Sequence, residues 1–409
     1  MQVNTNGRYN RKYCVYRRGI TMIINSIVGA PIPLPTNGEH RVRFIDPISG
    51  IVLKTQYLNT GSDATPPAMP DHPDHVFEEF NNDFTNVQRD IDVGLIYDTA
   101  DGKTHAHVRM TTVSGLDLTL YLEKLDTTLT VVTMGDGTTY DLTTSGLITV
   151  PHTYASIGDY VIKIGGGEYL LGHGTDVTAF CGGGVTNQLR CLTKLYISNV
   201  RYISDFACVT NHFLSSLTIP TYTVAVRDYA FVEALSIPAV NVPSSVTYVG
   251  AYAFSYITHM MTISLPDDLP VLGADSCRDN FSLTSFILPS GVTGVPDDLM
   301  NGNYSLERFI GHDGITSVGE YAFRQCYKLR QLEFGPNLSS IDQRAFQYCQ
   351  AIPHYVFHST TPPSLGVDTF YAIESCTKIY VPDDSLAAYK AATNWTTYAD
   401  YIYSISEMT

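Results

Sequence analysis

The chain has 409 residues, of which 44% are hydrophobic and 16% charged, so it can bury a core and is too apolar for a disordered protein. Its 40 acidic and 25 basic residues give a net charge of −15, which disfavours nucleic acid and anionic membranes as partners. The 28 Tyr and 31 Gly, with a single Trp, favour strands and tight turns, and we expect a mainly β, multidomain protein.

The first forty residues differ in character from the rest. Basic residues in "YRRG" precede the apolar stretch "ITMIINSIVGAPIPLP", as in a secretion signal, but Asn25, Ser26 and three prolines interrupt it. No run reaches the roughly 18 apolar residues of a transmembrane helix. We predict a docking arm over residues 1–40 and no insertion into a membrane.

Residues 41–100 are expected to form a small β domain. A first strand is followed by "GIVLKTQ", a Pro-rich turn and a last strand, "IDVGLIYD". This order resembles the internalin B-repeat module, which has a β-grasp-like fold. Phe77 and Phe80 stand where that family has an aromatic pair, without its usual Gly-Trp. "PDHPDH" at 70–75 could bind a metal, but loop Asp and His are more often solvated, and we assign no metal site.

Residues 101–165 are expected to form a β-sandwich. "MGDGTTY" reads as a hairpin because Asp-Gly supplies positive φ angles, and "HTYASIGDYVIKI" reads as a closing strand pair. Together they resemble a polycystic-kidney-disease (PKD)-like, Ig-like module, with Met134 in place of the usual aromatic residue. His105 and His107 in "HAH" share a strand face, and again solvation or a structural role is favoured over a metal.

Residues 166–190 are rich in glycine and are predicted to be a linker and an entry coil. The stretch contains no G-x-G-x-x-G, no G-K-[ST] and no amphipathic helix to offer its N-terminus, so a phosphate site is not expected. The glycines concerned, one of which ends the preceding module, are Gly165, Gly166, Gly167, Gly172 and Gly174.

The second half of the chain is a repeat. One apolar position recurs every 23 residues, with a last step of 24, at Ile203, Val226, Val249, Leu272, Val295, Val318, Ile341 and Leu365. A second register, from "LTIP" at 217 to "IYVP" at 379, keeps the same spacing. Two locked registers predict a solenoid in which each coil has a short strand and a compact turn.

Each coil should bury one face of its turn. In "ITSVGEYAF", Val318, Ala322 and Phe323 are spaced to lie on one side of a helical or 3₁₀ turn, with Gly319 allowing the turn. Cys208, Cys277 and Met300 should interrupt the aromatic ladder. The predicted structural ladder consists of Val226, Phe231, Val249, Phe254, Val318, Phe323, Ile341, Phe346 and Phe370.

The eight cysteines show no CxxC pair and no zinc-ligand spacing. Cys326 and Cys349 lie 23 residues apart in one register, so they are expected to stack as adjacent buried thiols. A disulfide or redox pair is the alternative.

The unit "LxIP...V..IG.yAF..C..L" resembles the BspA-like leucine-rich repeat, over residues 191–382. The ending, residues 383–409, is similar to the short helical cap that closes such arrays. In this cap Asp383 or Asp384 is expected to cap a helix carrying Leu386 and Tyr389, which with Trp395 would cover the end of the ladder.

Tyrosines occupy outward slots of the coils and offer large, rigid contact areas with a polar tip. The alternative is that they only decorate β surfaces. The predicted ligand-facing residues are Tyr196, Tyr202, Tyr229, Tyr248, Tyr252, Tyr321 and Tyr380.

Catalytic motifs such as a nucleophile elbow or HExxH do not occur, and regular coils present flat faces, so we expect no enzyme, no cofactor and no metal. The joined modules resemble a surface adhesin. Because export signal and anchor are not evident and free thiols fit cytoplasmic folding, we predict a bacteriophage virion protein, namely a head fibre, decoration protein or tail adhesin. A secreted bacterial cell-surface adhesin is the alternative. Expected partners are other virion proteins, bound through the arm, and a host-surface protein or glycan; a homo-oligomer stays open.

Overall fold

The computed structural model describes residues 38–112, 115–172, 174–175, 179–181, 191–373 and 377–408. The predicted docking arm therefore lies, up to residue 37, outside the described residues. The fold is mainly β, as predicted, and only 5% of it is helical. Within the described ranges, no helix combines the length and the apolar character needed to cross a membrane.

The first sheet has four strands in the order β2-β1-β4-β3. β1 pairs in parallel with β4, and the other pairs are antiparallel. Alternate residues of β1, Val42 and Phe44, join a small core of their own, whereas Arg41 and Arg43 on the opposite side are also buried. A sheet buried on both sides needs a second neighbour, and the repeat array supplies it. The strands are β1 Glu39–Asp46, β2 Ile51–Asn59, β3 His75–Phe80 and β4 Ile91–Thr99.

The next module is a sandwich of two sheets whose inner residues share one core with the repeats. Its larger sheet has the order β14-β12-β5-β10-β7-β8 and the smaller one β11-β6-β9, so array strands β12 and β14 extend the sandwich directly. β11 lies inside the predicted linker, because Tyr169 and Leu171 are apolar and buried. The strands are β5 Thr104–Met110, β6 Asp117–Lys124, β7 Thr130–Thr133, β8 Thr139–Leu142, β9 Gly146–Thr153, β10 Gly158–Gly165 and β11 Tyr169–Leu171.

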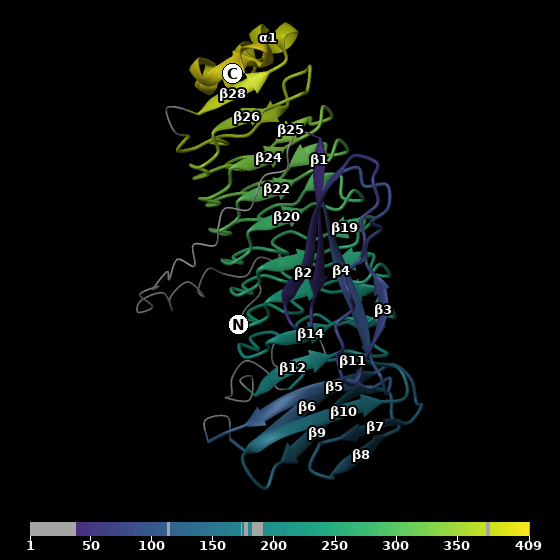
Figure 1. Cartoon of the computed structure of the whole chain (residues 1–409). Coiled ribbons are helices and arrows are strands. Elements are labelled where there is room, and N and C mark those ends of the chain that lie inside the picture. Colours follow the sequence, from purple (N-terminus) through teal and green to yellow (C-terminus); the bar gives the residue numbers. More distant parts are fainter. Residues whose placement is uncertain are drawn as a thin grey trace. The chain divides into compact units, whose positions relative to one another are not determined.

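The repeats form a solenoid of about nine turns, whose coils follow one another from teal to yellow in Figure 1. Each coil contributes one strand to each of two parallel series. The first series, which we call the strand face, is β12 Leu192–Tyr196, β14 Ser216–Thr218, β16 Ala239–Asn241, β18 Thr262–Ser264, β20 Ser285–Ile287, β22 Arg308–Ile310, β24 Gln331–Glu333, β26 His354–Val356, β28 Lys378–Val381 and β29 Ile402–Ser404. The second series is β13 Tyr202–Ile203, β15 Ala225–Val226, β17 Tyr248–Val249, β19 Val271–Leu272, β21 Gly294–Val295, β23 Ser317–Val318, β25 Ser340–Ile341 and β27 Ser364–Leu365.

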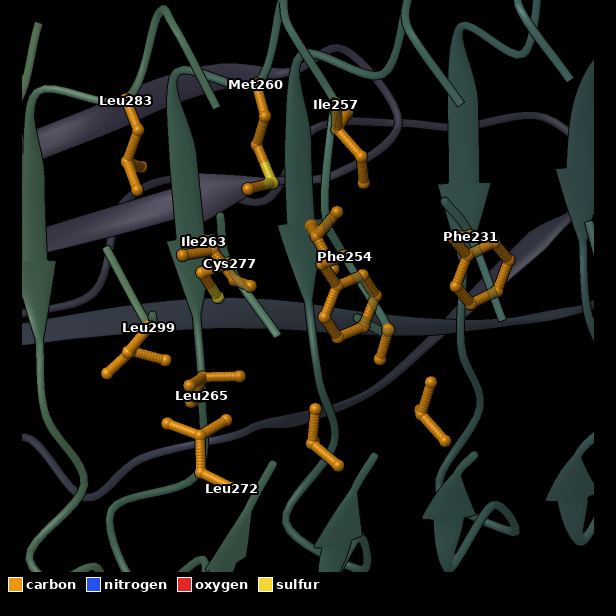
Figure 2. Close-up of a cluster of buried hydrophobic side chains, with 14 of the residues drawn as sticks. Phe231, Phe254, Ile257, Met260, Ile263, Leu265, Leu272, Cys277, Leu283 and Leu299 are labelled. Carbon is orange, nitrogen blue, oxygen red and sulfur yellow. The ribbon is translucent and has the colours of Figure 1, made fainter. Parts of the chain in front are cut away.

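The core of the array is the apolar ladder. Phe231 and Phe254 stack with ring centroids 5.7 Å apart, and Cys277 continues their row in the next coil (Figure 2). Phe346 stacks on Phe323 at 5.4 Å and on Phe370 at 5.6 Å. The nine residues of the predicted ladder are each at most 1% exposed, namely Val226, Phe231, Val249, Phe254, Val318, Phe323, Ile341, Phe346 and Phe370.

The turn after each second-series strand is not helical, in contrast to the expectation of a helical or 3₁₀ turn. Tyr252 and Tyr321 adopt φ angles of 58° and 56°, in the left-handed region. The N–H of Tyr252 donates to the carbonyl of Ala274 in the next coil at 3.1 Å. Stacking therefore supplies the backbone hydrogen bonds that a helix would make internally. Gly319 has no positive φ, but a Cβ there would collide with the backbone of Pro296 in the preceding coil.

A polar ladder runs beside the apolar one. The side-chain amides of Asn280 and Asn303 donate to carbonyls 26 residues earlier at 3.0 and 2.9 Å. Cys326 and Cys349 occupy the same slot, and their thiols reach carbonyls at the same separation at 3.2 and 3.0 Å. Both cysteines are free and buried, so the thiols are hydrogen-bonding members of the ladder.

The last coil is closed by a short cap. Trp395 is fully buried and contacts Phe357 and Phe370, with centroids 5.4 and 5.9 Å away, as expected. The predicted helix cap is wrong, because Ser385 precedes the helix without a side-chain bond to it, and Asp383 instead accepts from the Ser404 hydroxyl. The cap elements are η4 Asp383–Ser385, α1 Leu386–Ala391, η5 Trp395–Tyr401 and η6 Ile405–Glu407.

Candidate ligand-facing surface

The strand face is covered over its middle coils by the first sheet. The Asn241 side chain of β16 donates to the carbonyls of Ile45 and Leu95 at 2.8 and 3.0 Å. In return, Asn81 donates to the carbonyl of Val242 at 2.8 Å and to the Ser264 hydroxyl at 3.0 Å. Polar side chains on both partners thus hold the sheet to the array.

A buried charge cluster extends this contact to β20 and β22. Arg43 forms a bidentate pair with Asp92, and Arg308 of the array pairs with Asp90 at 2.7 Å. Arg43 also donates to the Ser285 hydroxyl at 3.0 Å. All of these side chains are at most 7% exposed. Charges this deeply buried persist only when paired, so the cluster fixes one docking position.

The rim of the contact closes the remaining access. Glu78 accepts from the Thr221 hydroxyl at 2.6 Å, and Glu79 accepts from the Ser244 hydroxyl at 2.7 Å. A crevice of about 10 Å³ beside Arg89 has room for about one water molecule. The covered part of the strand face is therefore not available to a partner. The sequence analysis did not predict this cover; polar residues in the outward slots, such as Asn241 and Ser264, are the signal in the sequence that marks it.

The second series presents an uncovered face. Tyr202, Ala225 and Tyr248 are neighbours in the parallel ladder, followed by Val271. Tyr248 is 38% and Val271 43% exposed, whereas Ala225 is 9% exposed. With strands about 4.8 Å apart, the two tyrosines stand on strands roughly 10 Å apart, on either side of the smaller Ala225. In the later coils the same slot holds only Gly294, Ser317, Ser340 and Ser364.

Arginines lie over the first of these tyrosines. The guanidinium carbons of Arg201 and Arg227 are 5.4 and 5.1 Å from the centroid of the Tyr202 ring, within cation–π range. The Tyr248 hydroxyl donates to Asp228 at 3.1 Å, and burial followed by the charge of Asp228 raises the Tyr248 pKa. We name Tyr202, Ala225, Arg227 and Tyr248 the tyrosine notch.

The turns beside the notch carry a stack of aromatic rings. Tyr229 lies between Phe206 and Tyr252, with centroids 4.7 and 4.8 Å away and planes within 7° of parallel. These two neighbours cover both faces of the Tyr229 ring, so only its edge and its hydroxyl are left for a ligand. The structure thus brings four of the predicted tyrosines together on the first coils, namely Tyr202, Tyr229, Tyr248 and Tyr252. Tyr252 is half-buried because its ring stacks on that of Tyr229.

The other predicted tyrosines lie elsewhere. Tyr321, three coils further on, has Arg324 over its ring at 5.3 Å and accepts from Arg344 at 3.0 Å. Tyr196 and Tyr380 are only 5% and 4% exposed, so the expectation that they point outward is wrong. Both belong to the strand-face series. There, neighbouring histidine rings cover them, at 4.3 Å for Tyr196 and 5.7 Å for Tyr380.

An acidic turn follows the aromatic stack. Asp275 takes the slot after Tyr252, and its pKa is raised to about 6 by burial and by the charge of Asp298. Arg278 bonds Asp275 at 2.9 Å and approaches Asp298 at 3.5 Å, so one cation serves both carboxylates. The stack of aromatic rings therefore ends at the carboxyl group of Asp275.

The histidines singled out in the sequence have structural partners. His72 bonds Asp46 at 2.9 Å and His105 bonds Asp101 at 2.8 Å. Burial, followed by the charge of Lys194, lowers the pKa of His107 to about 4. Across the described ranges, no three His, Cys, Asp or Glu side chains converge as metal ligands would. In the "MGDGT" hairpin Gly137, the glycine of the Asp-Gly pair, has a positive φ of 96°, whereas Asp136 does not.

These observations define a class: a leucine-rich-repeat solenoid of 23-residue coils with a short helical cap. The chain belongs to the BspA type leucine rich repeat region family, whose sequence model matches residues 187–307 and 300–392 in six copies, just over half of the chain. Proteins of this family are typically surface or extracellular, and leucine-rich-repeat proteins are generally not enzymes. The internalin-like and PKD-like resemblances stay predictions.

Solved structures give similar matches. A leucine-rich repeat protein of T. pallidum, TpLRR, is 26% identical over 32% of this chain, with a TM-score of 0.30, and this chain covers 61% of it. A leucine-rich repeat protein from Bacteroides ovatus is 15% identical, with a TM-score of 0.26. The match covers 52% of this chain and 83% of that protein. The pneumococcal vaccine antigen PcpA is 13% identical, with a TM-score of 0.24. The match covers 50% of this chain and 76% of PcpA. No curated protein matches the chain.

Proposed function

We propose that this chain is a non-enzymatic adhesion protein that binds a protein or glycan of a host surface through the tyrosine notch. The observation that carries the proposal is the division of the array into a covered and an uncovered face. Asn241 and Arg308 commit the middle of the strand face to an internal partner. Tyr202 and Tyr248 remain beside a small residue on the uncovered face, and aromatic rings around a notch are a common means of contacting partners.

The binding experiment uses the full chain, because the array shares its core with the preceding sandwich. Glycan arrays and host-surface extracts identify a ligand, and biolayer interferometry then compares variants. The double variant Tyr202→Ala with Tyr248→Ala should weaken binding at least about tenfold, since the loss of an aromatic anchor costs about 1–2 kcal/mol. Tyr327→Ala, a 40%-exposed tyrosine on another coil, should bind as the wild type does. Unchanged binding by the double variant would refute the notch as the contact site.

The surface that carries the protein is, in this proposal, a bacteriophage virion, where it serves as a head fibre, decoration protein or tail adhesin. The support is chemical: Cys208, Cys277, Cys326 and Cys349 are free and fully inside the array, which suits folding in a reducing cytoplasm before lysis. Residues 1–40 would dock the protein on other virion proteins. Mass spectrometry of purified virions should find the chain, and deletion of residues 1–40 should abolish its incorporation.

A secreted bacterial cell-surface adhesin is the second candidate. The family is typically found at surfaces, and this favours any surface carrier, bacterial ones included. Fractionation separates the two carriers. Recovery of the chain from bacterial envelopes alone, shortened near residue 30, would replace the virion proposal with this one and leave the notch proposal intact.

A further inference from the structure

The buried charges between the first sheet and the array do not balance. Among the side chains that the structure describes, three guanidinium groups, of Arg41, Arg43 and Arg308, lie with two carboxylates, of Asp90 and Asp92. Exposure of these five residues is between 1% and 7%. The cluster therefore holds one excess positive charge away from water, a state that proteins avoid unless a counter-charge is present.

The carboxylates are already engaged by other groups. Asp92 is fully used by the bidentate pair with Arg43. Asp90 accepts from Arg308 through one oxygen at 2.7 Å and from the backbone N–H of Arg41 through the other at 2.8 Å. The Nε of Arg41 stays 3.9 Å from the nearer oxygen of Asp90, beyond hydrogen-bond distance. Arg41 is thus the guanidinium without a carboxylate of its own.

Several donors in the same place lack acceptors. The Nε and Nη1 of Arg41 and the Nη1 of Arg308 are buried and have no hydrogen-bond partner among the described residues. Ser285 accepts from Arg41 at 3.3 Å and from Arg43 at 3.0 Å, so its own hydroxyl proton is available for a further acceptor. Arg41 and Arg308 approach the same oxygen of Asp90, at 3.9 Å from Nε and 2.7 Å from Nη2, so both guanidinium groups with unpartnered donors belong to one cluster.

We propose that a small monovalent anion binds between Arg41 and Arg308, beneath β1 and beside Ser285. A chloride-sized ion accepts from several N–H and O–H donors at once and cancels the excess charge. A water molecule could satisfy the donors but would leave the charge uncompensated. The anion completes the docking of the first sheet on the strand face.

The charge that the anion balances persists at neutral pH. Burial, followed by the charge of Arg43, lowers the pKa of Arg41, but only to about 10. Glu39, on the same side of β1, is only partly buried, in contrast to Arg41. Arg41 therefore remains protonated at pH 7, and the site keeps its charge throughout the physiological range.

Thermal unfolding of the full chain at constant ionic strength tests the site. The Tm of the wild type should be about 2 °C higher in sodium chloride than in sodium gluconate, because an ion that binds only the folded state stabilises it. Arg41→Gln removes the excess charge and should abolish the chloride effect. Arg109→Gln, which alters an exposed arginine of the sandwich, should keep it. An equal Tm of the wild type in both salts would overturn the proposal and leave water as the occupant.

Chloride-35 relaxation measured on the wild-type protein gives a readout that does not depend on the folding of any variant. Wild-type protein should broaden the chloride resonance in excess of bulk viscosity, and unlabelled bromide should compete the broadening away. Arg41→Gln should lose most of the excess broadening. Absence of broadening by the wild type, or broadening that Arg41→Gln retains in full, would also overturn the assignment.

Discussion

The two sides of the strand face are held by different chemistry. In β22, Phe309 points inward and stacks on Phe286 at 5.9 Å, whereas Arg308 points outward and pairs with Asp90. Inside the array, the buried ladder slot of the turns holds Phe254, Cys277 and Met300 in successive coils, since volume is what matters there. Outside, each polar group has one specific partner. The inner contact therefore builds the coil, and the outer contact selects a single position for a neighbouring sheet.

The largest expected effect comes from the inner contact. Phe254→Ala removes a fully buried ring that stacks on Phe231, and should cost about 4 kcal/mol of the free energy of unfolding. Urea unfolding followed by circular dichroism measures the loss. Tyr248→Ala, which truncates a 38%-exposed aromatic side chain of the neighbouring strand, should cost less than about 1 kcal/mol. Similar losses for the two variants would contradict a ladder-based core.

The outer contact should break locally. Asp92→Asn leaves Arg43 buried without its counter-charge and should cost about 3 kcal/mol. Backbone hydrogen exchange should accelerate in β1 and β4, while strands of the array such as β18 and β22 stay protected. Asp159→Asn, in a pair more than 60% exposed on both sides, is the control and should leave exchange unchanged. Equal loss of protection in β18 and β22 would show that sheet and array unfold as one unit.

Acid should test the same pair. Burial alone would raise the pKa of Asp92, but Arg43 and the two other arginines outweigh it and lower the pKa below its usual value. The stabilisation is thus present above the pKa of the unfolded chain, near 4, and is lost as the pH falls through the lower, folded value. Exchange in β1 should stay slow at pH 4 and accelerate only in stronger acid. Acceleration already between pH 6 and 5 would contradict this reading.

Close approach of the two surfaces should matter at a glycine. A Cβ on Gly94 would lie 2.7 Å from the Cγ of Asn241, so Gly94→Ala displaces the amide that bonds Ile45 and Leu95 and should cost about 2 kcal/mol. In a double-mutant cycle with Asn241→Ala, the added cost of Gly94→Ala should fall, because the contacts with Cγ and Nδ2 are removed and only the Cβ contact at 2.9 Å remains. Gly158→Ala, whose Cβ meets nothing nearer than 3.6 Å, is the matched control. A fully additive cycle would rule out the contact as the cause.

The sequence predicted the inner contact well and the outer contact not at all, for a physical reason. Phe254 and Phe323 belong to a pattern repeated in every coil, so periodicity alone reveals their burial. Arg308 and Asp90 are 218 residues apart and meet once, so no pattern marks them. Tyr196 and Tyr380 failed as surface residues because an outward slot is exposed only when nothing covers that face.

The smallest expected effect lies at the acidic end of the aromatic stack, where the inner and outer chemistries meet. The pKa of Asp275 is raised to about 6 by burial and by Asp298, so the folded state holds a proton that the unfolded chain releases near pH 4. Between these values stability falls as pH rises, because the folded state binds more protons than the unfolded state. Asp275→Asn should remove that slope, so that the variant is more stable than the wild type at pH 7 and equally stable at pH 4. Urea titrations at the two pH values measure it, with exposed Asp384→Asn expected to keep the wild-type slope. A loss of stability at pH 7 would mean that the bond from Arg278 to Asp275, at 2.9 Å, outweighs the cost of burying the carboxylate.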